Sequence, residues 1–354
     1  MPSRNVENIK ITPQMLTQIA ELDHFKATWS GFARLRPVQL GSLKKVSTIE
    51  SIGSSNRIEG NKLSDSEVEM LLSRINKTSF ASRDEEEVAG YAELMNIVFD
   101  DYTIIPLTEN YIKQLHKILL RYVTKDVSHR GNYKKLDNNI AAFDQDGKMI
   151  GIVFQTAAPF NTPRLIDELL DWTRSNLSDP FWHPLIVIGV FVAHFLAIHP
   201  FQDGNGRLSR ALTAMLLLQC GYSYIPYSSI ESIIESNKEG YYRALRRTQK
   251  NIWSDEADYG PWLSFFLTTL QKQKRHLESK IATMPVDPYD LSLGRNDRAV
   301  LELFEKDPEW STPATAGALG LNINTAAKTI KRLVDRGYLV KHGLTKGVWY
   351  TKRG

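Results

Sequence analysis

Residues 199–210 form the run whose residue types and spacing could carry out chemistry. His199 can accept a proton near neutral pH, and Asp203, four residues later, offers the hard carboxylate oxygens that Mg²⁺ prefers. Arg207 and Arg210 are three residues apart, so one helical face can present both guanidinium groups to phosphates. This combination suits a site that holds a nucleoside triphosphate and activates an attacking hydroxyl group.

Two apolar segments flank this run and are predicted to be helices. Pro184–Ile198 is almost continuously apolar and begins with proline, a favourable first helical residue. After the run, leucines recur at helical spacing until Gly221. The sequence therefore predicts helix, tight loop, helix, with Gly204, Asn205 and Gly206 at the start of the second helix. Backbone N–H groups and the helix dipole make that position an anion site.

Other phosphate and metal signatures do not fit the same residues. The Gly204–Gly206 turn follows a helix rather than a strand, and Ser209 stands where a dinucleotide fingerprint needs a third glycine. The sequence contains no Gly-x4-Gly-Lys-Ser/Thr loop. His194 and His199 are five residues apart, which is the wrong spacing for two zinc ligands on one helical turn.

The run resembles the Fic-domain signature, His-x-Phe-x-Asp/Glu-Gly-Asn-Gly-Arg-x-x-Arg, and matches each fixed position. Fic proteins have an all-helical core, and most of them transfer AMP from ATP to a Ser, Thr or Tyr hydroxyl group of a protein. The resemblance implies that His199 is the general base, that Phe201 anchors the loop in the core, and that Asp203 binds Mg²⁺.

The same resemblance assigns the phosphate contacts. The backbone of Gly204, Asn205 and Gly206, together with the Asn205 side chain, would bind the α- and β-phosphates. Arg207 would contact the β-phosphate and Arg210 the γ-phosphate. A lysine in place of Gly206 would indicate the branch that phosphorylates its target, so the glycine favours AMP transfer.

A second motif, Ser55-x-x-x-Glu59-Gly60, lies near the N-terminus. Taken alone it is a helix end, with Gly60 as the residue after the cap. It also matches the Ser/Thr-x-x-x-Glu-Gly/Asn inhibitory motif of Fic proteins, so we interpret Ser55 and Glu59 as inhibitory residues, with Glu59 paired to Arg210. This resemblance implies a self-inhibited enzyme. In some family members the glutamate supports AMP removal, so a hydrolase that uses Glu59 is an alternative.

Two further features extend the resemblance. Residues 138–142 and 149–155 flank Asp146-Gly147, a hairpin turn signal. The hairpin is either an ordinary surface hairpin or the flap that docks an extended target segment by strand addition. Asn237 and the pair Tyr241-Tyr242 stand where the family often places adenine-pocket residues, and we select Asn237 and Tyr242 as candidates, although tyrosines in helices also pack cores.

Size and composition predict two or three domains for the 354 residues. Hydrophobic residues make up 42% of the chain, an ordinary value for a globular protein. Cys220 is the single cysteine, which excludes intrachain disulfides and fits a reducing cytoplasm. The first residues lack the apolar stretch of a signal peptide, and Pro184–Ile198 is too short to span a bilayer. We therefore expect a cytoplasmic protein without a membrane partner.

The predicted fold class is mainly α: a Fic-type helical core with a small β-hairpin flap, plus a C-terminal winged helix-turn-helix domain. Residues 1–85 should form a helical N-terminal region with the inhibitory motif, and residues 86–283 the catalytic core. Two prolines mark residues 284–290 as a linker. Residues 291–354 hold 11 Lys and Arg against 6 Asp and Glu, whereas the rest of the chain is nearly neutral.

Residues 291–354 show the pattern of a winged helix. Helices are predicted over 295–306, from Thr312 to Gly320 and from Asn322 to Arg336, followed by a hairpin wing over 338–350. The expected buried face of the last helix is Ile323, Ala327, Ile330 and Val334. The expected exposed set, with two wing lysines, is Asn324, Thr325, Lys328, Thr329, Lys331, Arg332, Lys341 and Lys346. Such a face could bind duplex DNA, but winged helices also serve as protein-docking or dimerisation modules.

The sequence therefore favours a self-inhibited adenylyltransferase that uses ATP and Mg²⁺ and modifies a target protein or itself. A rival class is a DNA-binding regulator whose Fic core senses nucleotide. The resemblance also leads us to expect a homo-oligomer.

Overall fold

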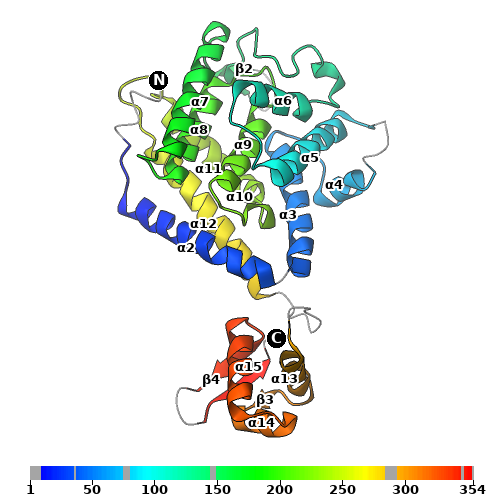
Figure 1. The fold of residues 1–354 in the computed structure, drawn as a ribbon. Helices are drawn as coiled ribbons and strands as arrows, with labels where there is room; N and C mark the ends of the chain where they lie inside the picture. The colour runs from blue at the N-terminus through cyan, green and yellow to red at the C-terminus, as the bar shows by residue number, and fades with distance from the viewer. Residues whose placement is uncertain are drawn as a thin grey trace. The chain divides into compact units, whose positions relative to one another are not determined.

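The computed structural model describes residues 9–35, 37–74, 80–143, 149–283, 293–343 and 347–352. The chain divides into two compact units, one of residues 1–30 and 41–278 and the other of residues 31–40 and 279–354. Helices make up most of both units (Figure 1), which confirms the mainly α fold class. Among the described helices, none combines the length and apolar character that crossing a membrane requires.

The described helices that precede residue 283 contribute buried apolar side chains to the first unit. They are α2 (Pro13–Leu35), α3 (Pro37–Ile58), α4 (Asp65–Leu72), α5 (Arg83–Asp101), α6 (Glu109–Leu119), α7 (Thr162–Ser178), α8 (Pro184–Ile198), α9 (Asn205–Gln219), α10 (Ile230–Ser236), α11 (Lys238–Gln249) and α12 (Gly260–Ala282). Short 3₁₀ turns occur at Thr124–Asp126, Pro159–Asn161 and Ile225–Tyr227.

Helix α8 is the centre of the first unit. All its residues from Leu185 to Ile198 are buried, because a helix that is apolar on every side must be surrounded. Helices α7, α9 and α11 contact it. Helix α12 also approaches closely at Gly189, where Trp262 Nε1 donates to the glycine carbonyl at 2.7 Å and a Cβ would lie 2.6 Å from Leu263 Cδ2. This packing holds α8 in place, and residues 199–210 begin directly at its C-terminal end.

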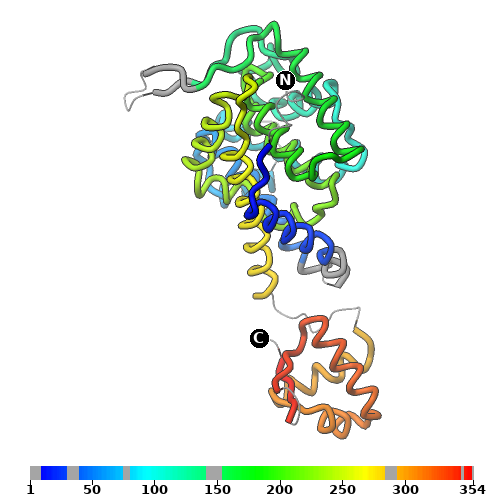
Figure 2. Tube along the Cα trace, turned by 90° about the vertical axis from the view of Figure 1, so that its left-hand side faces the viewer, coloured from blue at the N-terminus to red at the C-terminus, as the bar shows by residue number. Residues whose placement is uncertain are grey.

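Helices α2 and α3 bring the N-terminal motif to this core. Helix α2 lies beside α12 in both views (Figures 1 and 2), and Gln18 Nε2 donates to Thr268 Oγ1 at 3.0 Å. Helix α3 ends at Ile58, and Gly60, with a φ of 99°, turns the chain after it, as the sequence predicts. Glu59 is therefore held at a fixed helix end.

The predicted hairpin is present as strands β1 (Ile140–Phe143) and β2 (Met149–Phe154), which pair antiparallel. Ile140 pairs with Phe154 at its base. The predicted turn at Asp146-Gly147 and the predicted linker over 284–290 lie outside the described residues.

The second unit contains the predicted winged helix. Its core gathers Val300, Leu301, Phe304, Ile330 and Leu333. Its elements are α13 (Arg295–Lys306), β3 (Glu309–Trp310), α14 (Thr312–Leu319), α15 (Ile323–Asp335), β4 (Leu339–His342) and β5 (Trp349–Lys352), with the sheet order β3-β5-β4. The three helices and the wing are confirmed, and β3 is an additional strand that the sequence did not predict.

The predicted inner face of α15 was correct at Ile330, which is buried, and at Val334, which packs partly buried against the core, but it was wrong at Ile323 and Ala327. The buried residues are Ala326, Thr329, Ile330 and Leu333, whereas Ile323 is 52% exposed and Ala327 is exposed. Apolar residues occur on two overlapping stripes of this helix, and its packing against α13 selects the stripe that includes Leu333.

Thr329 therefore leaves the predicted exposed set, and Lys346 lies outside the described residues. Thr325 is half-buried. The members of the set that are exposed are Asn324, Lys328, Lys331, Arg332 and Lys341.

Candidate active site

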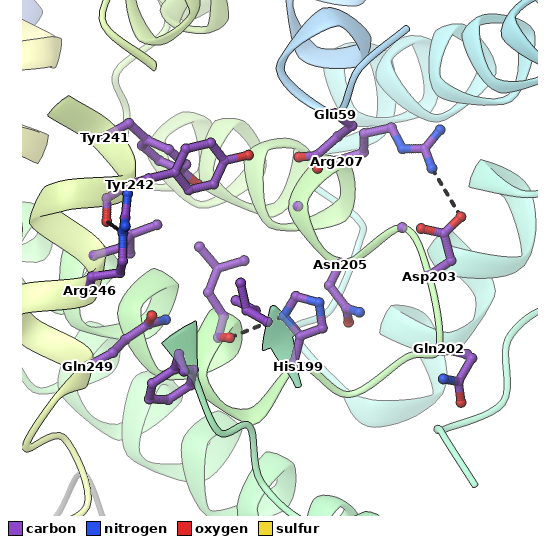
Figure 3. Close-up of a pocket in the computed structure, with 16 residues that line it drawn as sticks. Glu59, His199, Gln202, Asp203, Asn205, Arg207, Tyr241, Tyr242, Arg246 and Gln249 are labelled. Atoms are coloured by element: carbon purple, nitrogen blue, oxygen red, sulfur yellow. Dashed lines mark hydrogen bonds and ion pairs between the residues drawn. The ribbon is translucent and has the colours of Figure 1, made fainter. Parts of the chain in front are cut away.

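His199 ends α8 in a left-handed backbone conformation, with φ 52° and ψ 60°. No other non-glycine residue of the described chain has a positive φ. This conformation costs roughly 1–3 kcal/mol, so the surrounding contacts must hold it. It is fixed in part by the backbone N–H of His199, which donates to the Phe195 carbonyl at 2.9 Å. The turn points the imidazole ring into a cavity at the start of α9 (Figure 3).

The ring of His199 has one defined proton position. Its Nδ1 lies 3.2 Å from the Leu196 carbonyl, and a carbonyl can only accept, so Nδ1 carries the hydrogen and Nε2 keeps its lone pair. Burial lowers the pKa of His199 to about 4, although the Leu196 carbonyl and the carboxylates of Glu59 and Asp203 raise it. The ring is therefore neutral near pH 7, with Nε2 free to accept a proton.

The loop after His199 is braced from inside. Phe201 is fully buried, as predicted, and its backbone N–H and carbonyl bond to Asn205 Oδ1 at 2.9 Å and Nδ2 at 2.7 Å. His116 stacks on the Phe201 ring at 3.8 Å between centroids, and its Nε2 donates to the Asp203 carbonyl at 3.0 Å. The Asn205 side chain thus shapes the loop, a contact the sequence reasoning did not foresee.

Helix α9 begins directly behind this loop. Gly204 has a φ of 78°, which favours glycine, and Asn205 and Gly206 form the first helical turn. The free N–H groups of a first helical turn and the helix dipole attract anions. The predicted helix start is therefore confirmed, and it lies beside His199 (Figure 3).

Asp203 and Arg207 face each other across the mouth of this site. Arg207 is 3% exposed, and its guanidinium lies 3.5 Å from Asp203 Oδ2 and 3.1 Å from Glu87 Oε2. Arg83 Nη2 also donates to Asp203 Oδ2, at 3.2 Å. The sequence did not indicate a role for Arg83 and Glu87. They lie in a run of five charged residues, 83–87, that matches no motif.

Arg210 binds the N-terminal motif. Its Nε donates to Ser55 Oγ at 2.8 Å, and its Nη2 donates both to the Ser55 carbonyl at 2.8 Å and to Glu59 Oε1 at 2.8 Å. The Glu59 carboxylate lies directly over Gly206, where an added Cβ would collide with its Oε1. A carboxylate thus sits at the helix N-terminus, in the position that suits an anion.

His199, Asp203, Arg207 and Glu59 line one cavity of about 480 Å³, a size typical of small-molecule sites, whereas Arg210 and Ser55 are not among its lining residues. One face of α11 lines its far end, with Tyr242, Leu245, Arg246 and Gln249 at helical spacing (Figure 3). Asn237 is exposed and does not line the cavity. The remaining lining residues are Ile140, Phe154, Leu196, Gln202, Gly204, Asn205, Gly206 and Tyr241.

Gln249 and Arg246 are polar groups at this far end that the sequence analysis did not predict.

Gln249 is the more buried of the two. It is 3% exposed and lines the cavity (Figure 3). Tyr241, by contrast, packs its ring against Trp262 and Phe265, so it belongs mainly to the core. The signal that could have found Gln249 was its spacing of seven residues from Tyr242, two helical turns on the same face.

Among the described residues, no group of three or more His, Cys, Asp or Glu side chains could by itself hold a metal ion. Asp203 is nevertheless 41% exposed at the cavity wall. Its Oδ2 is paired with Arg83 and Arg207. A carboxylate at the start of a helix suits Mg²⁺, which in proteins is commonly held by one or two carboxylates together with phosphate oxygens.

The first unit is thus a helical domain in which a loop presents a neutral histidine next to a helix N-terminus, with arginines and a carboxylate close by. Residues 106–217 match the Fic/DOC family, and residues 293–340 match the winged helix-turn-helix DNA-binding family. The chain therefore contains a Fic domain followed by a winged helix-turn-helix domain.

Curated relatives bear related names. The chain is 25% identical over 259 residues to the protein adenylyltransferase Fic of Drosophila willistoni, covering 72% of this chain and 46% of the relative. It is 28% identical over 114 residues to a probable protein adenylyltransferase of Aquifex aeolicus (strain VF5), covering 32% and 35%. The chain thus spans less than half the length of these relatives.

Solved structures share the fold. A Fic family protein from Desulfovibrio desulfuricans G20 aligns with a TM-score of 0.60 at 22% identity, covering 98% of this chain and 97% of that one. A Fic domain-containing signaling protein from Bacteroides thetaiotaomicron VPI-5482 aligns with a TM-score of 0.59 at 24% identity, covering 73% and 95%.

We predict that ¹⁵N NMR of histidine-labelled protein finds His199 as the Nδ1–H tautomer, neutral from pH 8 down to about pH 5, because burial holds its pKa near 4. The His199→Ala variant assigns its signals. His116 is an internal control with the opposite tautomer, since its Nδ1 accepts from the Gly131 N–H at 2.9 Å. A His199 ring that titrates between pH 6 and 7 would contradict this assignment.

Proposed function

We propose that this protein is an adenylyltransferase that transfers AMP from ATP to a Ser, Thr or Tyr hydroxyl group of a target protein or of its own chain. The observation that carries the proposal is the shared cavity, in which the free Nε2 of His199 faces the N-terminus of α9. The relatives named protein adenylyltransferase support the same reaction. Within it, residues 86–283 would form the catalytic core, preceded by the inhibitory region over 1–85 and joined to residues 291–354 by the linker over 284–290.

The proposed step is one in-line substitution at the α-phosphorus. The acceptor oxygen bonds to phosphorus while its proton passes to Nε2 of His199, and the bond to the β-phosphate oxygen breaks. Pyrophosphate leaves with the negative charge. Bound Mg²⁺ would neutralise phosphate charge, and Asp203 is the residue placed to hold it.

The chain supplies the remaining electrostatic stabilisation. The N–H groups of Gly206 and Arg207 at the start of α9 would bind phosphate oxygens, and Arg207 lies beside them. Arg210 would bind the γ-phosphate once its guanidinium is released from Glu59. The base would lie against Tyr242 and Leu245 at the far end of the cavity.

We also propose that the chain is inhibited by Glu59. Its carboxylate occupies the anion position over Gly206 and pairs with Arg210, so it competes with phosphate for both partners. Negative charge placed there repels the γ-phosphate and leaves ATP in a pose unsuited to attack. Any event that moves the end of α3 would shift the population toward the active state.

Substitution of Glu59 tests the transferase and its inhibition together. Glu59→Gly should raise AMP transfer roughly 5- to 150-fold, the usual range of a regulatory coupling energy. His199→Ala in the same background should lower it by at least ~10²-fold while ATP still binds. The measurement is intact mass after incubation with ATP and Mg²⁺.

Glu69→Gln, on the exposed side of α4, is the matched control and should leave transfer unchanged. If Glu59→Gly gains no AMP adduct, a lysate with labelled ATP supplies external acceptors. Equal transfer by the His199→Ala variant would remove His199 as the base. Loss of AMP from a labelled acceptor that depends on Glu59 would instead favour the AMP-removing hydrolase.

DNA binding by residues 291–354 is a second proposed function. Lys328 and Lys331 are exposed on α15, and Lys341 is exposed on the wing. The match of residues 293–340 to winged helix-turn-helix DNA-binding domains favours duplex DNA as the partner of this face. Exposed lysines supply the sequence-independent part of such binding.

This second function predicts salt-dependent binding of duplex DNA. The double variant Lys328→Ala, Lys331→Ala should weaken binding and lower the slope of log K against log salt by about 2, because two phosphate contacts are lost. Lys306→Ala, exposed at the end of α13, is the control. Fluorescence anisotropy with a labelled duplex measures both. Absence of binding at low salt would leave this face as a protein-docking or dimerisation surface.

A cytoplasmic location and a homo-oligomeric state remain proposals. The single cysteine supports the first. Sedimentation of the purified chain would decide the second.

A further inference from the structure

Three side chains beneath the catalytic loop take no part in the steps above. Lys134 is 3% exposed, and its Nζ donates to Asn138 Oδ1 at 2.7 Å, to Thr156 Oγ1 at 3.0 Å and to the Ile198 carbonyl at 3.0 Å. These three acceptors satisfy all three N–H bonds of an ammonium group. We call Lys134, Asn138 and Thr156 the strap.

The strap holds four consecutive carbonyl groups of the catalytic loop, residues 198–201. Lys134 donates from Nζ and from its backbone N–H, and Asn138 donates from Nδ2. The bonds run from Lys134 Nζ to Ile198 at 3.0 Å, from Asn138 Nδ2 to His199 at 3.1 Å, from Lys134 N to Pro200 at 2.9 Å and from Asn138 Nδ2 to Phe201 at 2.6 Å. Each carbonyl on both sides of the His199 turn is therefore tied to one of two residues.

These hydrogen bonds hold His199 in its unfavourable left-handed backbone conformation. A left-handed backbone at a non-glycine residue persists only where the surroundings over-determine it. The carbonyls before and after the His199 side chain are both fixed by the strap, so the direction of the ring is fixed as well.

The strap also closes the base of the β1–β2 hairpin. Asn138 and Asn139 precede β1, and Thr156 follows β2. Thr156 donates from Oγ1 to Asn138 Oδ1 at 2.9 Å and from its backbone N–H to Asn139 Oδ1 at 3.0 Å. One residue further, the Ala157 N–H donates to the Ala197 carbonyl at 3.2 Å, at the end of α8.

We infer that Lys134 is a positioning residue that, through the strap, fixes His199 to the base of the β1–β2 hairpin, so that hairpin and general base move as one body. This inference rests on the proposed AMP transfer and on the interpretation of the β1–β2 hairpin as the flap that docks an acceptor segment. The acceptor hydroxyl and the base that deprotonates it then share one frame, which attack at phosphorus requires.

The charge of Lys134 supports a role beyond space-filling. Its buried ammonium has only neutral acceptors in the strap, and burial lowers the pKa of Lys134 to about 8 despite nearby Asp137. The same charge lowers the pKa of His199, whereas Glu59 at the end of α3 and Asp203 in the loop raise it. Loss of Lys134 would therefore raise the pKa of His199.

The test compares Lys134→Met and Lys134→Arg in the Glu59→Gly background, with the acceptor that this background labels. Lys134→Met should lower the maximal transfer rate ~10²-fold while the ATP concentration for half-maximal rate stays within about threefold, because the base is misplaced but ATP contacts remain. The acid limb of the pH–rate profile should move to higher pH. Lys134→Arg, which keeps the charge, should restore part of the rate.

Lys274→Met is the matched control. Lys274 is 15% exposed on α12 and pairs with Glu278 at 3.0 Å, away from the cavity. It should change neither the rate nor its pH dependence. A folded Lys134→Met variant with a rate within twofold of its parent, or a loss equal to that of Lys274→Met, overturns the inference.

If the Lys134→Met variant does not fold, Thr156→Val tests the inference in its place. It keeps the side-chain shape and removes one acceptor, so the rate should fall about fivefold, and an unchanged rate overturns the inference. If Glu59→Gly labels no acceptor, the proposed function fails, but the inference can still be tested. Amide hydrogen exchange is then compared between the natural sequence and variants that keep Glu59. Faster exchange across residues 198–205 in Thr156→Val but not in Lys274→Met supports the strap, and equal exchange overturns it.

Discussion

The left-handed turn at His199 is the constraint on which the site depends. It lets α8 stop and α9 start within six residues, so that a proton acceptor and a helix N-terminus face one cavity. The turn is unfavourable for a histidine, and the chain surrounds it with support. His116 stacks beneath Phe201, Asn205 braces the Phe201 peptide, and Lys134 binds the carbonyl before the turn.

The second organising feature is the positive N-terminus of α9, for which the Glu59 carboxylate and a phosphate group would compete. The N-terminus of α9 attracts an anion, and the absence of a side chain at Gly206 lets that anion come close. In this structure the anion is the Glu59 carboxylate, which also takes Arg210. The proposed inhibition is thus direct occupancy of the phosphate position. Arg57 secures the same turn, with bonds to Glu235 at 2.7 Å and Asp65 at 2.9 Å, so the inhibitory position depends on the packing of α3 against α4 and α10.

Some elements of this fold follow from neighbouring residues in the sequence, and others depend on contacts between residues far apart in it. The bounds of α8 follow from a proline start and a continuous apolar run, and those of α13 and α14 follow from equally local start and stop signals. Half of the predicted inner face of α15 was wrong because two apolar stripes overlap there, and only packing against α13 chooses between them. Arg83 was missed because nothing in its sequence neighbours shows that it pairs with Asp203, and Gln249 because its helical spacing from Tyr242 was not used.

The sequence by itself determined the loop, its glycines, the helix ends and the set of groups that could do chemistry, because these depend on residues within a few positions of one another. The tertiary structure decided which of them meet. It confirms the contact of Glu59 with Arg210 across 151 residues, which only the family resemblance led us to expect, and it alone placed Lys134 against Ile198 across 64. It also placed Tyr242 in the cavity while leaving Asn237 outside it. Such contacts arise from how whole helices pack, and helix packing depends on side-chain fit over the entire core.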